Sequence, residues 1–179
     1  WEATTLNSWL RVGFDHHKAE ARAKAWQPLL GGGLGGLALL AGLILLGLAS
    51  GGFTMADALG ADLHDHALYP AIVALVMLGS FTKSAIFPFH FWLPNAMEAP
   101  SPVSALLHSA TMVKAGVYLI ARLHPTLGGT LAWDETLTFG GGFTMLFAVY
   151  LATRQTALKR ILAYSTVSSL GTLVMLIGM

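Results

Sequence analysis

Cysteine is absent from this chain, and charged residues are scarce. Without cysteine there is no disulfide framework, no thiolate metal site and no cysteine nucleophile. Only 11% of the 179 residues are charged and 55% are hydrophobic, whereas soluble domains carry about 25% charged residues. The net charge of +1 argues against a nucleic-acid partner, which a strongly basic surface would indicate. Together with a mean hydropathy of +0.64, this composition indicates a membrane protein.

Long apolar stretches dominate what is present. A membrane-spanning helix needs about 20 mostly apolar residues, and lipid requires helices because every backbone polar group must be satisfied internally. We therefore predict an all-α membrane helix bundle, a single domain over residues 1–179. Residues 1–13 resemble the end of one helix, and the chain begins without methionine and stops within an apolar run, so we expect a fragment of a longer protein. The predicted spans lie near residues 29–50, 68–93, 103–121, 135–153 and 161–179.

The basic residues predict how the chain is oriented in the membrane. Seven of the ten Lys and Arg residues fall in two connections, residues 11–24 and 154–160. Short loops rich in Lys and Arg stay in the cytoplasm, so both connections are predicted to be cytoplasmic in a multi-pass protein of the cell membrane. Four crossings separate them, which is an even number and therefore consistent. The acidic connections 51–67 and 122–135 are then expected outside.

Lys83 is the most informative residue, because it lies well inside the apolar stretch 68–93. A charged side chain at membrane depth is costly and by default marks an ion or proton pathway. Pro88 lacks the N–H that would bond to the carbonyl of Ser84, so it should break the helix, and broken helices build ion sites in transporters. The alternative is a lysine at a helix end whose ammonium reaches the lipid headgroups.

The stretch 103–121 holds two more titratable residues, His108 and Lys114. Six residues separate them by about 9 Å along a helix and place them on different faces. A water molecule or a hydroxyl group would have to connect them. Histidine changes its charge near neutral pH, which suits a proton relay. A single histidine on an apolar helix is more often a packing residue, but Lys114 in the same span is hard to explain as packing.

Glu2 and Lys159 are weaker candidates. Glu2 is either a surface carboxylate or a buried one that needs a cationic partner such as Lys83 or Lys114. Separating such a pair disfavours the ammonium, so the pair can act as a switch. Lys159 is explained by topology, and we consider it a tentative proton entry. The His-Asp-His run at residues 64–66 could bind a metal ion, but a solvated loop is favoured and we predict no metal site.

The run FTKSAIFPFHFWLPNAMEAPSPVSALLHSATMVKAG at residues 81–116 resembles the core of the proton-translocating antiporter-like subunits. These subunits occur in multi-subunit (Mrp-type) cation/proton antiporters and in respiratory complex I. Two flanking pieces agree: WE at residues 1–2 followed by GFD at residues 13–15, and LKRILAYST at residues 158–166. Within the family, residues 87–100 are most similar to the large A-type subunits of the Mrp antiporters, and the equivalent subunits of complex I come second.

The resemblance implies roles for individual residues. Glu2 and Lys83 match the glutamate and lysine whose ion pair is thought to gate proton transfer, with Lys83 on the broken helix. His108 and Lys114 match polar groups that carry protons along the centre of the membrane. One departure is Ile86, where the family pattern has glutamine, which puts hydration beside the break in doubt.

The function implied is that of a proton-translocating membrane subunit of a multi-subunit monovalent cation (Na+)/proton antiporter. It would need no cofactor and no covalent chemistry, and its partners would be other membrane subunits, H+, Na+ or another monovalent cation, and the lipid bilayer. One alternative is a proton-pumping subunit of NADH-quinone oxidoreductase (complex I) or of a membrane-bound hydrogenase relative. Another is a membrane scaffold whose buried charges only specify helix assembly.

Overall fold

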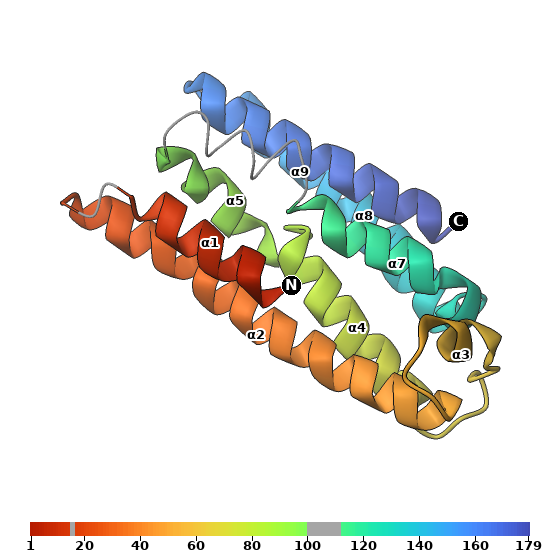
Figure 1. Cartoon of the computed structure of the whole chain (residues 1–179). Coiled ribbons are helices and arrows are strands. Elements are labelled where there is room, and N and C mark those ends of the chain that lie inside the picture. The colour runs from red at the N-terminus through yellow and green to blue at the C-terminus, as the bar shows by residue number, and fades with distance from the viewer. Residues whose placement is uncertain (15–16, 100–111) are drawn as a thin grey trace.

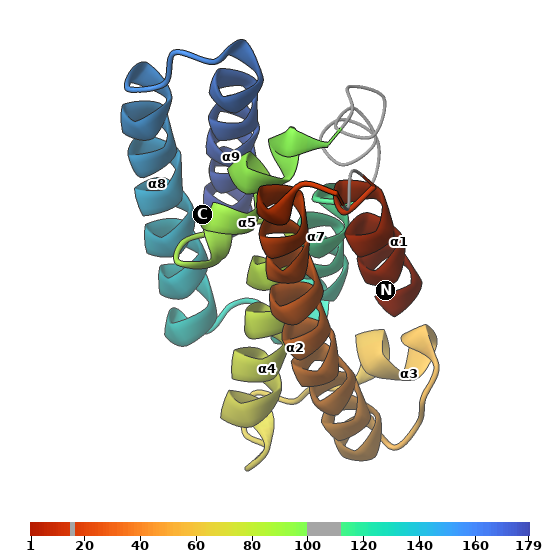
Figure 2. The same ribbon diagram turned by 90° about the vertical axis from the view of Figure 1, so that its left-hand side faces the viewer.

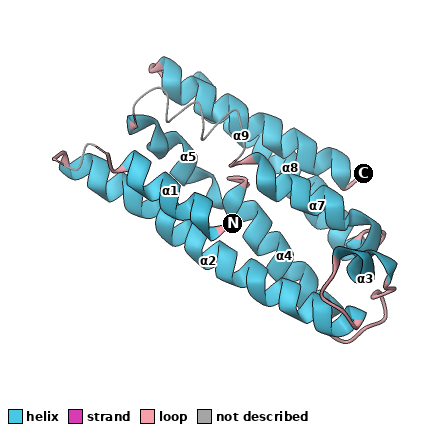
Figure 3. Cartoon of the chain, viewed as in Figure 1, coloured by secondary structure: helices cyan, strands magenta, loops and turns pink. Residues whose placement is uncertain are grey.

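The computed structural model describes residues 1–14, 17–99 and 112–179, and in them it contains helices and short connections without strands. The predicted all-α fold is confirmed, and the helices pack lengthwise into a bundle (Figures 1 and 3). His108 lies outside the described residues. In chain order the helices are α1 (Glu2–Val12), α2 (Ala19–Ser50), α3 (Met55–Gly60), α4 (Tyr69–Lys83), η1 (Phe89–Phe91), α5 (Trp92–Asn95), η2 (Ala96–Glu98), α7 (Lys114–Leu127), α8 (Leu131–Thr153) and α9 (Leu158–Ile177).

Three helices in the described part of the chain are long and apolar enough to cross a membrane. They are the segment Arg22–Ser50 of α2, the whole of α8 and the whole of α9, while α4 is a shorter apolar helix. Helix α2 begins ten residues before the predicted span at residue 29. Its first turns are rich in Ala, Lys and Arg, which are strong helix formers, so the helix continues beyond its apolar part.

The connection predicted at residues 122–135 is much shorter in the structure. Helix α7 continues to Leu127 and α8 begins at Leu131. The side chain of Thr130 accepts a hydrogen bond from the backbone N–H of Trp133 and caps α8. Asp134 therefore lies in the first turn of α8 rather than in a loop, where a carboxylate is favoured by the helix dipole.

The two basic connections lie at the same end of the bundle. Residues 13–14 and 17–18 lie between α1 and α2, and residues 154–157 join α8 to α9. Figures 1 and 2 place both at one end, whereas α3 and the connection between α7 and α8 lie at the other. This is the arrangement that the charge pattern predicts for a chain that crosses a membrane repeatedly.

Helix α4 ends earlier than the break that we predicted from the position of Pro88. Helix α4 ends at Lys83, and Ala85 adopts a left-handed backbone conformation with φ 53°. The N–H of Ile86 donates to the carbonyl of Phe81 at 3.0 Å, which is the hydrogen bond that closes a Schellman motif. The predicted break is therefore present, but Ser84 caps the helix end instead of losing a partner inside a helix.

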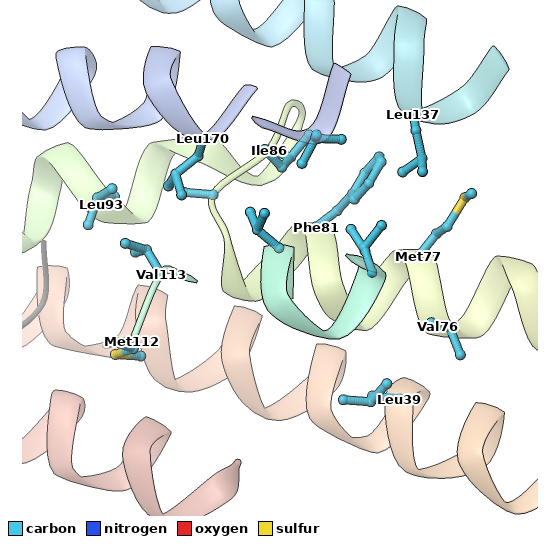
Figure 4. Close-up of a cluster of buried hydrophobic side chains, with 14 of the residues drawn as sticks. Leu39, Val76, Met77, Phe81, Ile86, Leu93, Met112, Val113, Leu137 and Leu170 are labelled. Atoms are coloured by element: carbon cyan, nitrogen blue, oxygen red, sulfur yellow. The ribbon is translucent and has the colours of Figure 1, made fainter. Parts of the chain in front are cut away.

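Ile86 is completely buried at this break. It belongs to the cluster of buried hydrophobic side chains drawn in Figure 4, together with Phe81, Leu137 and Leu170. These side chains come from α4, α8 and α9, so the break is packed into the interior of the bundle. The residue that departs from the family pattern thus fills an apolar site.

Candidate functional site

Lys83, the last residue of α4, is held by the first turns of α1. Its side chain is 2% exposed. The ammonium nitrogen Nζ donates to the carbonyl oxygen of Trp1 at 3.1 Å, to Thr4 Oγ1 at 2.6 Å and to Thr5 Oγ1 at 3.0 Å. An ammonium has three N–H donors and no acceptor, so these three oxygens satisfy it completely. The Lys83 side chain is therefore buried against α1 rather than exposed at the end of α4.

The three acceptors lie together because of helix geometry. Trp1 is the N-cap residue of α1. Thr4 and Thr5 follow it by three and four residues, which places all three on one face of the helix. Nζ also lies 5.0 Å from the centre of the Trp1 ring, within the range of a cation–π interaction. Thr5 is fully buried. The ammonium is therefore enclosed by neutral oxygens and an aromatic face.

Glu2 lies close to this site, but its carboxylate points elsewhere. A Cβ atom added to Gly36 of α2 would overlap Glu2 Oε1, so the carboxylate occupies the space that the missing side chain leaves. Among the described residues, Glu2 and Lys83 form no ion pair. The structure brings the two residues to neighbouring positions around α1 and keeps their charges apart.

The other predicted site residues lie away from Lys83. Lys114 is the first residue of α7, and its side chain is exposed because the described helices leave that face of α7 uncovered. Lys159 is in the first turn of α9, and its Nζ donates to the carbonyl of Ala99 at 3.3 Å. Since His108 lies outside the described residues, the relay through residues 103–121 stays a prediction.

Hydrogen bonds from side chains secure the break next to Lys83. Trp92 Nε1 donates to the carbonyl of Thr82 at 3.0 Å. Ser84 Oγ donates to the carbonyl of Val113 at 2.7 Å and accepts from the N–H of Val117 at 3.1 Å. Ser84 thus bridges the first turn of α7, where helix N–H groups lack intrahelical partners. The broken segment is positioned by specific bonds rather than by packing alone.

Four buried side-chain atoms in the described residues have no hydrogen-bond partner within the chain. They are Trp1 Nε1, Ser8 Oγ, Ser80 Oγ and His90 Nδ1. Buried polar groups are nearly always paired in folded proteins. Ser8 Oγ lies on α1, the helix that holds Lys83, and Trp1 Nε1 belongs to the N-cap residue of that helix.

The sequence interpretation missed Thr4, Thr5 and Ser84. Threonine and serine in a lipid-embedded helix commonly bond to the backbone of their own helix, so their presence did not indicate a partner. The spacing of Trp1, Thr4 and Thr5 was the available signal. It places the two hydroxyl groups near the backbone carbonyl of Trp1 on one face of the helix.

A separate set of polar contacts lies at the end of the bundle that contains α3. It joins the connection that follows α3 to the connection that follows α7. His64 Nδ1 lies 2.8 Å from Asp62 Oδ1, and His64 Nε2 lies 2.8 Å from the carbonyl oxygen of Gly128. These bonds raise the pKa of His64, and the bond from His64 lowers the pKa of the Asp62 carboxyl. Within the described ranges, no group of three or more acidic or histidine side chains could hold a metal ion.

Comparison with known proteins gives consistent matches over the whole chain. Residues 1–179 match the family described as "NADH:quinone oxidoreductase/Mrp antiporter, TM". The chain is 48% identical over 181 residues to the A/B subunit of a probable K(+)/H(+) antiporter of Rhizobium meliloti, covering 100% of this chain and 18% of that protein. It is 45% identical over 180 residues to the A-type subunit of a Na(+)/H(+) antiporter of Bacillus subtilis, covering 99% and 22%.

A solved structure agrees with these matches. The structure of the Mrp complex from Dietzia sp. DQ12-45-1b matches with a TM-score of 0.92 and 39% identity. The match covers 99% of this chain and 20% of that one. The chain thus spans about a fifth of the length of the relatives that it matches.

Proposed function

Because this chain belongs to the transmembrane family of the NADH:quinone oxidoreductases and Mrp antiporters, we propose that it translocates protons as part of a multi-subunit monovalent cation/proton antiporter. The relatives support this proposal, since their names describe antiporter subunits. The similar solved structure is an Mrp complex, which supports other membrane subunits as partners. The coupled cation in this proposal is Na+ or another monovalent cation, because the relatives' names include both Na+ and K+.

The single observation that carries the proposal is the burial of Lys83 beside a broken helix. An ammonium at this depth is costly, and here only neutral oxygens accept its hydrogen bonds. Its stability therefore depends strongly on how close the carboxylate of Glu2 lies. When Glu2 approaches, the ammonium is favoured; when Glu2 withdraws to Gly36, Lys83 gives its proton to the next group.

The further steps of the pathway follow from the same reasoning. His108 and Lys114 are the proposed next carriers, and the exposed position of Lys114 at the start of α7 leaves it open to a proton arriving from outside this chain. Lys159 is the proposed entry for protons at the basic end of the bundle. No cofactor takes part in these transfers, which involve only protonation and deprotonation of side chains.

The direct test uses everted membrane vesicles that contain the complete complex. The vesicle interior is acidified, NaCl or KCl is added, and the collapse of the pH gradient is followed with a fluorescent dye. We expect a cation-dependent collapse that vesicles lacking the complex do not show. No cation-dependent collapse would contradict the antiporter proposal.

The second candidate function is a proton pump driven by quinone reduction, since the description of the family that the chain matches also names NADH:quinone oxidoreductase. The same vesicles distinguish the two functions. A pump acidifies the interior when NADH and a quinone are supplied, without any added cation. Acidification under those conditions alone would establish the second candidate.

The orientation can be tested separately, since the chain has no native cysteine. We propose that the end with residues 17–18 and 154–157 faces the cytoplasm. Thr156 lies between α8 and α9, Ala67 lies between α3 and α4, and both are exposed. Figure 1 places these two connections at opposite ends of the bundle. A membrane-impermeant thiol reagent added to intact cells should label Ala67→Cys and spare Thr156→Cys; the reverse pattern would invert the proposed topology.

A further inference from the structure

The hydroxyl groups around Lys83 differ in what their hydrogen atoms can do. The hydroxyl of Thr4 donates to the carbonyl of Trp1 at 2.7 Å, so its oxygen is left to accept from Lys83 Nζ at 2.6 Å. The carbonyl of Trp1 can only accept. These two oxygens therefore only accept from Lys83, and such bonds are stronger to the charged ammonium than to the neutral amine.

Thr5 is different, because its hydroxyl hydrogen makes only a long hydrogen bond. Its hydroxyl lies 3.4 Å from the carbonyl of Trp1 and 3.0 Å from Lys83 Nζ. A hydroxyl group can donate or accept, and it rotates to suit its neighbour. Toward the ammonium, Thr5 Oγ1 accepts the third N–H. Toward a neutral amine, which has two N–H groups and a lone pair, the same hydroxyl can turn and donate to the lone pair.

We propose that Thr4 and Thr5 are positioning residues for proton transfer at Lys83, in which Thr4 stabilises the ammonium and Thr5 pairs with the nitrogen in both protonation states. This inference rests on the proposed function. A buried donor or acceptor without a partner is expensive. Rotation of the Thr5 hydroxyl avoids that state when the proton leaves, so the energy difference between the two forms of Lys83 stays small.

The structure favours substitutions that remove the hydroxyl and keep the volume. Thr5 is fully buried and packs against Gly32, where an added Cβ would lie 2.8 Å from its methyl carbon. Valine has the same branched shape, so Thr5→Val and Thr4→Val change hydrogen bonding with little change in packing. Thr5→Ser keeps the hydroxyl. Ser8→Ala is the matched control, since Ser8 is a buried hydroxyl on the same helix without a partner.

The two threonines predict different results for transport as a function of pH. Thr4→Val removes a bond that is stronger to the ammonium than to the amine, so the alkaline limb of the profile should move down by about one pH unit. Thr5→Val removes a partner of both forms. Transport should then fall roughly tenfold at every pH, with Thr5→Ser restoring it to within about twofold.

The other titratable groups near Lys83 are common to all these variants. Glu2 of α1 is the charged group that acts on Lys83, and His90 of η1 and Lys114 of α7 lie on further described elements that contact α4. On α2, the residues that meet Glu2 and the neighbouring Thr82 are Gly36 and Gly35, which carry no charge. A difference between variant profiles therefore reports on the Lys83 site itself.

The experiment measures cation-driven proton transport by the complete complex in vesicles, divided by the amount of assembled complex. Rates and profiles for Thr4→Val and Thr5→Val that match those of wild type and Ser8→Ala would overturn the inference and leave the proposed function intact. An uncorrected rate loss that disappears on division by assembled complex would also overturn it. If Thr5→Val does not assemble, Thr5→Ala carries the same test. Absence of transport in the wild-type complex would remove the proposed function and this inference together.

Discussion

The carboxylate of Glu2 lies directly against Gly36 of α2, in space that any side chain at position 36 would fill. With Glu2 in this place, the ammonium of Lys83 bonds to Thr4, Thr5 and the Trp1 carbonyl instead. The carboxylate and the ammonium therefore have separate partners. An ion pair between Glu2 and Lys83 would require the carboxylate of Glu2 to leave Gly36.

Substituting Gly36 tests whether this contact matters. Gly36→Ala should push the flexible end of Glu2 away from α2 and toward Lys83, which stabilises the ammonium and slows proton release. We expect transport per assembled complex to fall severalfold. Gly33→Ala is the control, because an added Cβ there meets nothing within 4 Å and alanine is favoured over glycine in a helix. Equal transport by the two variants would contradict the proposed role of Gly36.

Ser84 should stabilise the junction between the break and α7. Its fully buried hydroxyl bridges the carbonyl of Val113 and the N–H of Val117. Ser84→Ala leaves these groups without that partner and should lower the free energy of unfolding by about 1–3 kcal/mol. Denaturation of the purified complex measures the change. Ser80→Ala is the matched control, since Ser80 Oγ is buried without a partner. A loss as large in the control as in Ser84→Ala would contradict the prediction.

His64 should make the contact between its connection and Gly128 depend on pH. Both ring nitrogens face acceptors, Asp62 Oδ1 and the Gly128 carbonyl, so the protonated imidazole with two N–H groups fits best. Because these bonds raise the pKa of His64, its contribution is complete below the ordinary value of 6.5 and is lost as the pH rises through the raised value. The pKa of Asp62 is lowered, so its contribution persists above 3.8 and disappears only as the pH falls through the lowered value.

Hydrogen exchange of residues 61–68, corrected for intrinsic exchange rates, measures this effect. Protection should decline as the pH rises above about 6.5. His64→Gln keeps an N–H for Gly128 without titrating, so its protection should be nearly independent of pH. The same decline in wild type and His64→Gln would show that another group is responsible.

Some of the site could be predicted from the sequence because of the energetics of lipid. A lysine inside an apolar stretch had to be buried or had to reach the surface, and its distance from the ends of the stretch favoured burial. The proline predicted a break, but not its position. Helix α4 ends before Pro88 because Ala85 adopts a left-handed conformation, which alanine alone does not suggest.

The partners of Lys83 could not be predicted in the same way. Glutamate is the obvious partner for a buried lysine, whereas the structure uses two threonines and a carbonyl. That choice depends on how α1 is rotated against α4 and on the room for Glu2 at Gly36. Both are properties of helix packing, to which residues distant in the sequence contribute.

The central claim is that the buried ammonium of Lys83 carries the proton, and transport by Lys83→Ala tests it most directly. The measurement is the cation-driven pH change in vesicles per assembled complex, compared with wild type and with Arg122→Ala, which removes an exposed cation from α7. We predict a loss of roughly tenfold or more in Lys83→Ala and none in Arg122→Ala. An unchanged rate per complex in Lys83→Ala, even with reduced assembly, would contradict the claim and favour a purely structural role for Lys83.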